Sequence, residues 1–185
     1  LHDALPISPL EPVQILWVNL VTDTSMVIPL GLEPAEKNIM KQLPKNIDAP
    51  ILDKVMVWRM AVAAGTMAAI ALITYVFFEK HYGHNYAQTL AFISLVVSQW
   101  ANAFNARSDQ DSVFTRLKVM NRGFYIGIAM SLTLQALVLF GPLGEILHIH
   151  QVAIHHMALI SVISLIIPVA ASEIHKWQSR KAKRT

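Results

Sequence analysis

One apolar stretch, residues 12–32, constrains the fold of this chain more than any other feature of its sequence. About 20 residues at 1.5 Å each match a bilayer core of roughly 30 Å, so the stretch is predicted to cross a membrane as a helix. Asp23 lies near its middle. A charge at that depth costs about 2.5–3.5 kcal/mol on insertion scales, which makes Asp23 a candidate for function.

Two further polar residues accompany this carboxylate. Asn19, Thr22 and Asp23 are spaced i, i+3 and i+4, so a helix places them on one face. Together they offer carboxylate, amide and hydroxyl oxygens, which suit a hard cation. Pro29 is expected to disturb the helix one turn later and to free carbonyl oxygens. The alternative is that these polar groups only join helices by hydrogen bonds.

Four more apolar stretches follow the first one. We place them at residues 55–78, 87–104, 123–140 and 152–172. The chain is 54% hydrophobic and 15% charged, whereas soluble domains carry about 25% charged residues. Its mean hydropathy is +0.45. The sequence therefore predicts an all-α fold, a polytopic membrane bundle of five transmembrane helices.

The positive charges are distributed unevenly between the two sides of this bundle. Fourteen of the fifteen Lys and Arg residues lie in residues 33–59, 106–122 and 173–185, and the fifteenth is Lys80. The positive-inside rule puts these three regions, including the C-terminus, in the cytoplasm. We expect a multi-pass membrane protein, in the plasma membrane if the source is prokaryotic, whose basic charge contacts lipid head groups rather than nucleic acid.

Small and polar residues mark two of the later helices. Ala61, Gly65 and Ala69 recur every four residues, which lets another helix approach closely or simply reflects alanine-rich packing. Gln99 and Asn102 lie in the third stretch. Polar groups in a membrane helix face other helices or a water-filled path, so these two side chains are weaker candidates for the ion path.

Four histidines gather before and within the fifth stretch. They are His148, His150, His155 and His156. Imidazoles at this spacing suggest a zinc or copper site, but histidines at the membrane interface are the more ordinary explanation. The chain has no cysteine, which excludes disulfides, thiolate metal sites and cysteine nucleophiles.

A longer motif surrounds the polar residues of the first helix. Residues 9–40 read PLEPVQILWVNLVTDTSMVIPLGLEPAEKNIM. This run resembles the sixth transmembrane helix and following loop of P-type cation-transporting ATPases, nearest to the subgroup that includes calcium pumps. The matching residues are Pro12, Gln14, Ile15, Leu16, Trp17, Asn19, Leu20, Val21, Thr22, Asp23, Leu30, Gly31, Glu33 and Pro34. The four later helices then match helices seven to ten.

The resemblance implies roles for individual residues. Asn19, Thr22 and Asp23 match the ion ligands of the sixth helix, and the Ala61, Gly65 and Ala69 stripe resembles the face by which the seventh helix packs on the fifth. Three departures leave the cation open. Thr24 replaces a glycine, residues 26–28 replace a small, proline-containing segment so that Pro29 lies further downstream, and Gln99 replaces an acidic residue. Ca²⁺ is the first cation to expect, and another cation remains an alternative.

The resemblance also implies that the chain is a fragment. We expect residues 1–8 to be a linker-derived segment, 9–176 the membrane domain and 177–185 a basic tail. ATP and Mg²⁺ would bind only in missing domains, so this segment alone would not hydrolyse ATP although the intact pump would. Its partners would be the lipid bilayer and the missing helices and cytoplasmic domains of the same pump. The alternative is a stand-alone membrane subunit for binding or assembly, without catalysis.

Overall fold

A computed structural model of the chain describes residues 8–34, 54–108 and 111–182. The first apolar stretch is one continuous helical rod in three parts, namely α1 (Pro12–Trp17), a π-helical segment η1 (Val18–Asp23) and α2 (Thr24–Gly31). Residues 1–7 of the segment predicted as a linker, and most of the predicted loop after Leu32, lie outside the described residues.

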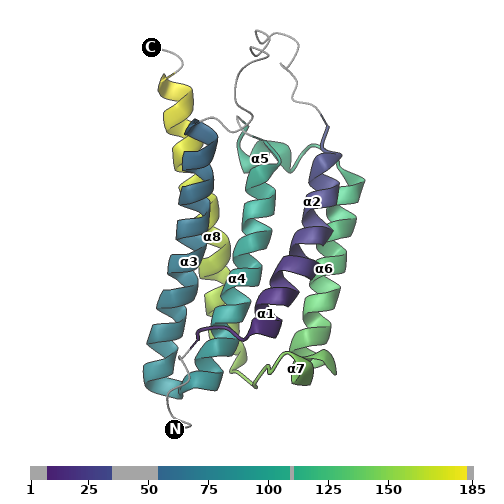
Figure 1. Cartoon of the computed structure of the whole chain (residues 1–185). Helices are drawn as coiled ribbons and strands as arrows, with labels where there is room; N and C mark the ends of the chain where they lie inside the picture. The colour runs from purple at the N-terminus through teal and green to yellow at the C-terminus, as the bar shows by residue number, and fades with distance from the viewer. Residues whose placement is uncertain (1–7, 35–53, 109–110, 183–185) are drawn as a thin grey trace.

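Four long helices and two short ones complete the described bundle (Figure 1). The long helices are α3 (Lys54–Tyr82), α4 (His84–Ala106), α6 (Arg122–Phe140) and α8 (Ile154–Ala182). The short helices α5 (Val113–Arg116) and α7 (Leu143–Ile146) lie at opposite ends of the bundle. Each long helix corresponds to one predicted apolar stretch, so the all-α membrane bundle is confirmed.

Helix α4 occupies the centre of the bundle. It packs against α3 and α8 on one side and against η1 and α2 on the other. Its side chains Leu90, Phe92 and Val96 are fully buried. Because protein surrounds α4, it can carry buried polar residues such as Ser94 and Ser98, which would be costly against lipid.

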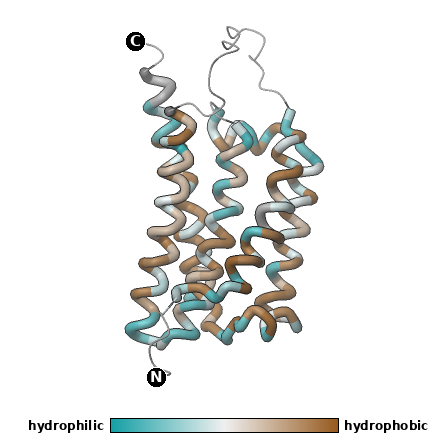
Figure 2. Tube along the Cα trace, viewed as in Figure 1, coloured by the Kyte–Doolittle hydropathy of each residue, from teal (hydrophilic) through white to brown (hydrophobic). Residues whose placement is uncertain are grey.

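The other helices expose apolar faces. Pro12–Gly31, Val55–Tyr82, Arg122–Phe140 and Ile154–Gln178 are each long and apolar enough to cross a membrane. Only 28% of the most apolar window of α3 and 17% of that of α8 is buried. Figure 2 shows apolar residues along much of each helix and hydrophilic ones near the ends. Such outward apolar faces are what lipid contact requires. The chain is therefore an integral, multi-pass membrane protein.

The irregular backbone of the first helix lies earlier than the sequence predicts. We expected Pro29 to disturb the helix, but α2 continues through Pro29 to Gly31. The departure from α-helical geometry falls instead at Val18–Asp23, one turn before the proline. Pro29 lacks an N–H and leaves one carbonyl without its helical partner, yet packing against α6 holds the helix together.

The last helix extends further than its apolar stretch. We expected it to end near Ser172, but α8 continues to Ala182 and takes in part of the predicted basic tail. Lys176 lies in this extension and is buried. Its Nζ donates hydrogen bonds of 3.1 Å to the carbonyl oxygens of Asn105, at the end of α4, and of Asp111, shortly before α5. These bonds tie the end of α8 to the α4–α5 connection.

Candidate functional site

The three polar residues of the first helix all lie in the π-helical segment. Val18–Asp23 contains Asn19, Thr22 and Asp23, and no more than six residues form the segment. Asn19 is exposed on the surface of the bundle. The side chains of Thr22 and Asp23 lie outside the described part of the structure, so only their backbone placement is established. The helix therefore departs from α geometry at the residues singled out from the sequence.

A π-helical turn changes what the backbone can do. Its hydrogen bonds run from i to i+5, so the ordinary i to i+4 ladder is interrupted where α and π geometry meet. Inside a membrane, an irregular turn is tolerated only where it is buried in protein or lines a cavity. Segments of this kind occur frequently at functional sites.

Contacts on both sides hold this segment in place. Before it, the buried side chain of Gln14 donates from Nε2 to the carbonyl oxygen of Leu147 at 3.0 Å. The same side chain accepts a 3.1 Å bond from the Glu11 N–H through its Oε1. Leu147 directly follows α7, so Gln14 fixes the start of the first helix to the end of the bundle at which α7 lies.

After the segment, a polar cluster fixes the other end of the helix. Glu33 accepts from Arg107 Nη2 at 2.9 Å and from Asn121 Nδ2 at 2.7 Å. Asn121 also donates to the carbonyl oxygen of Pro29 at 3.2 Å. Arg107 donates from Nη2 to the carbonyl oxygen of Val119 at 2.7 Å. The end of α2 is thus bonded to the end of α4 and the start of α6.

Helix α6 approaches α2 very closely. A Cβ atom placed on Gly127 would overlap the carbonyl oxygen of Ser25 and press on the ring of Pro29. Glycine is required here because any side chain would separate the two helices. Sequence reasoning missed this contact, as well as the bonds of Gln14, Arg107 and Asn121. Gln14 and Glu33 belong to the sequence motif, but nothing in the sequence identifies their distant hydrogen-bond partners.

The weaker candidates, Gln99 and Asn102, lie about one turn apart on α4. Gln99 is half-buried on α4, whereas Asn102 lines a pocket between α3, α4 and α8. No residue of η1 is among the described residues that line this pocket. Asn102 and Asn19 therefore do not share this pocket. The role of Gln99 in an ion path remains a prediction.

The small residues of α3 face outward. Ala61, Gly65 and Ala69 are all exposed, and a Cβ atom on Gly65 would meet nothing within 4 Å. Within the described part of the chain, no helix covers this stripe. The face is therefore open to lipid or to a further helix.

The histidines do not form a metal centre in the described structure. Among the described residues, no three His, Cys, Asp or Glu side chains lie close enough together to hold a metal ion. His156 Nδ1 instead lies 2.7 Å from the hydroxyl of Tyr86, and its ring contacts Phe78 and Tyr82 edge-on. The hydroxyl of Tyr86 also accepts a 3.0 Å bond from the N–H of Ala153. These contacts join α3, α4 and α8 at one end of the bundle.

Comparison with known proteins identifies the family to which this chain belongs. The family described as "Cation transporting ATPase, C-terminus" matches residues 7–178, nearly the whole described chain. This chain belongs to that family. The resemblance inferred from the first helix is therefore confirmed, and this ATPase C-terminal domain supplies the membrane helices described above. The family match extends through all five long helical segments, including the four for which the sequence offered only layout and short matches.

Individual relatives agree with this assignment. The chain is 37% identical over 150 residues to a calcium-transporting ATPase of Bacillus subtilis, covering 78% of the chain and 16% of that protein. It is 27% identical to calcium-transporting ATPase 1 of Bacillus cereus, covering 91% of the chain and 21% of the relative. It is 26% identical to human calcium-transporting ATPase type 2C member 1, covering 95% of the chain and 19% of that relative. The chain thus spans about a fifth of the length of these relatives.

Proposed function

We propose that this chain is the C-terminal transmembrane portion of an ATP-driven cation pump, and that Asn19, Thr22 and Asp23 supply ligands to its transport site. The observation that carries the proposal is the π-helical turn Val18–Asp23, which contains all three residues within a membrane-spanning helix. A π-helical turn changes the regular hydrogen-bond ladder beside these side-chain oxygens, and such turns are frequent at functional sites. The bonds of Gln14 and Asn121 on either side support a fixed position for the turn.

Ca²⁺ is the cation that this proposal favours. The relatives described above are named calcium-transporting ATPases. Ca²⁺ takes six to eight oxygen ligands, including carboxylates, amide carbonyls and backbone carbonyls. Asp23 supplies a carboxylate, Asn19 supplies an amide carbonyl, and the π-helical turn supplies backbone carbonyls. Three residues cannot complete such a shell, so the remaining ligands would come from helices of the same pump beyond this chain.

The proposed pump couples this site to ATP used elsewhere in the protein. ATP and Mg²⁺ would bind in cytoplasmic domains outside this chain, whose phosphorylation would expose the site alternately to each side of the membrane. The exposed stripe Ala61, Gly65 and Ala69 is the surface on which we place a further helix of the pump. Close packing there would transmit helix movements, because small residues allow two backbones to touch.

The substitution Asp23→Asn in the complete pump tests the assigned ligands. It keeps the size of the side chain but removes the negative charge that would bind the cation. We expect Ca²⁺-dependent phosphorylation from ATP to be lost, as measured by incorporation of labelled phosphate at increasing Ca²⁺ concentrations.

Asp111→Asn is the matched control. It makes the same chemical change at a partly exposed aspartate that pairs with Arg116 outside the spanning helices. This control should leave phosphorylation and its Ca²⁺ dependence unchanged. Wild-type phosphorylation and transport in the Asp23→Asn pump would refute the assignment.

A further inference from the structure

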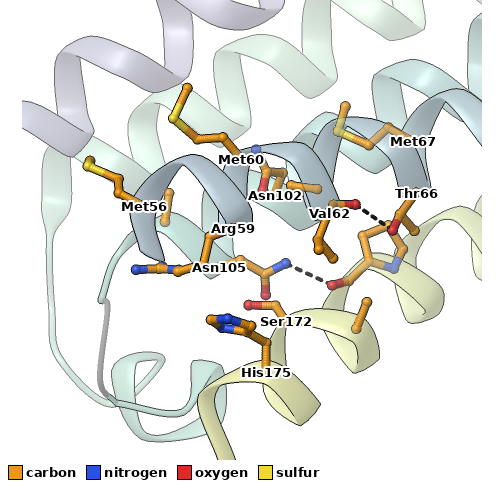
Figure 3. Close-up of a pocket in the computed structure, with 14 residues that line it drawn as sticks. Met56, Arg59, Met60, Val62, Thr66, Met67, Asn102, Asn105, Ser172 and His175 are labelled. Carbon is orange, nitrogen blue, oxygen red and sulfur yellow. Dashed lines mark hydrogen bonds between the residues drawn. The ribbon is translucent and has the colours of Figure 1, made fainter. Parts of the chain in front are cut away.

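A pocket of about 250 Å³ lies between α3, α4 and α8, away from the candidate cation site. Figure 3 shows its lining, which comes from the start of α3 and the ends of α4 and α8. These are the ends that carry the basic segments of the chain (Figure 1). The pocket therefore opens near one surface of the membrane, at the depth where phospholipid head groups meet acyl chains.

The lining is divided into an apolar wall and a polar end. The wall consists of α3 side chains, namely Met56, Met60, Val62, Ala63 and Met67. The polar end carries Arg59, Asn102, Asn105, Ser172 and His175. Arg59 lies in the second turn of α3, and His175 lies three residues before the end of the apolar span of α8. Both side chains are thus at interfacial depth.

Asn105 presents an unused hydrogen-bond acceptor at this polar end. It is 5% exposed, and its Nδ2 donates to the carbonyl oxygen of Pro168 at 3.1 Å. That bond fixes the orientation of the amide and turns Oδ1 toward Ser172 and His175 (Figure 3). Oδ1 is buried and has no hydrogen-bond partner in the structure. A buried acceptor without a donor is unfavourable, so a donor from a ligand would be favoured there.

We propose that this pocket binds an anionic phospholipid whose head group also carries a hydroxyl donor, with phosphatidylglycerol as the defining chemistry. Arg59 and His175 face the phosphodiester, and the hydroxyl of the head group donates to Asn105 Oδ1. One acyl chain lies along the methionine-lined wall of α3. Basic pockets between membrane helices near the cytoplasmic surface are suited to such head groups, and flexible methionines adapt to an acyl chain.

A helix from the same pump fits this pocket less well. The backbone N–H groups of a helix interior are already bonded within the helix, so they cannot reach Asn105 Oδ1. A helix would also cover the polar and apolar parts of the pocket with one uniform surface.

Native mass spectrometry of the whole purified chain in detergent, with equal amounts of phosphatidylglycerol and phosphatidylcholine, tests the proposal. We expect phosphatidylglycerol to be retained preferentially, because phosphatidylcholine has no net charge and no hydroxyl donor. Arg59→Ala should weaken phosphatidylglycerol binding by about fivefold, the effect of one basic side chain near an anionic head group. Arg59→Lys should restore most of it.

Arg122→Ala is the matched control, because Arg122 is an exposed cation at the start of α6, near the same surface of the bundle. It should leave lipid binding unchanged, and circular dichroism should show equal helix content in all variants. Equal retention of the two lipids would overturn the proposal and favour a protein segment as occupant. Equal losses in Arg59→Ala and Arg122→Ala would also overturn it.

Discussion

At the residue scale, Arg107 is a buried charge whose partners come from three parts of the chain. Its side chain is 1% exposed and pairs with Glu33, which is 10% exposed, at 2.9 Å. Its guanidinium also lies 4.8 Å from the centre of the Phe124 ring. Buried ion pairs contribute little net stability but are costly to break, because the remaining partner keeps an uncompensated charge.

Arg107→Met is therefore expected to destabilise the chain. The substitution removes the guanidinium from Glu33 and from the Val119 carbonyl, so we predict a loss of about 3 kcal/mol in the free energy of unfolding. Thermal unfolding in detergent measures it. The double variant Glu33→Gln, Arg107→Met should lose less, since no buried charge remains. Lys118→Ala, an exposed cation nearby, should have no effect. An unfolding temperature for Arg107→Met equal to that of the unsubstituted chain would contradict the prediction.

At the scale of elements, the contact between α2 and α6 determines how the candidate site is supported. Gly127 lies against the Ser25 carbonyl and the Pro29 ring, and Asn121 bonds to the Pro29 carbonyl one and a half turns away. These contacts lie directly after the π-helical turn. Helix α6 thus supports the part of the first helix that Pro29 would otherwise weaken.

Gly127→Ala tests this packing. The added methyl group would force α2 and α6 apart, and overpacking of this kind costs about 1–3 kcal/mol. Gly65→Ala is the matched control, because the same methyl group on α3 meets open space. It should be neutral or stabilising by up to about 1 kcal/mol, as expected for glycine replaced in a helix. Thermal unfolding in detergent compares the two, and equal unfolding temperatures would contradict the predicted contact.

At the scale of the whole molecule, the basic segments meet at one end of the bundle. The start of α3, the helix α5 and the end of α8 lie together there, opposite α7 and the α3–α4 turn (Figure 1). This agrees with the charge pattern, from which we propose that this end faces the cytoplasm.

The absence of cysteine makes this orientation directly testable. Lys118→Cys and Gln151→Cys place single thiols at exposed positions near opposite ends of the bundle. A membrane-impermeant maleimide should label Gln151→Cys in intact cells, whereas Lys118→Cys should react only after permeabilisation. The opposite labelling pattern would invert the proposed orientation. Labelling of both variants in intact cells would show that the reagent entered, and denatured samples provide the measure of full reactivity.

Much of this arrangement could be predicted from local sequence. The five helical stretches were placed correctly in order and nearly in extent, because length and apolarity are properties of each stretch alone. Their ends were less predictable, as Lys176 shows. Its position beside a basic run predicts a solvated side chain, yet its Nζ donates to the carbonyl oxygens of Asn105 in α4 and of Asp111 before α5. Those partners lie far away in the sequence.

The sequence by itself determined the number of long helices, the side on which positive charge gathers and the position of the polar residues in the first helix. Only the tertiary structure decided that α4 is central, that the irregular turn lies at Val18–Asp23 rather than at Pro29, and that Gln14 reaches Leu147. The physical reason is that the first group of properties depends on residues close together in the sequence and the second on residues far apart in it. Burial in lipid depends on the composition of each stretch, whereas helix distortion and polar pairing depend on which helix faces meet.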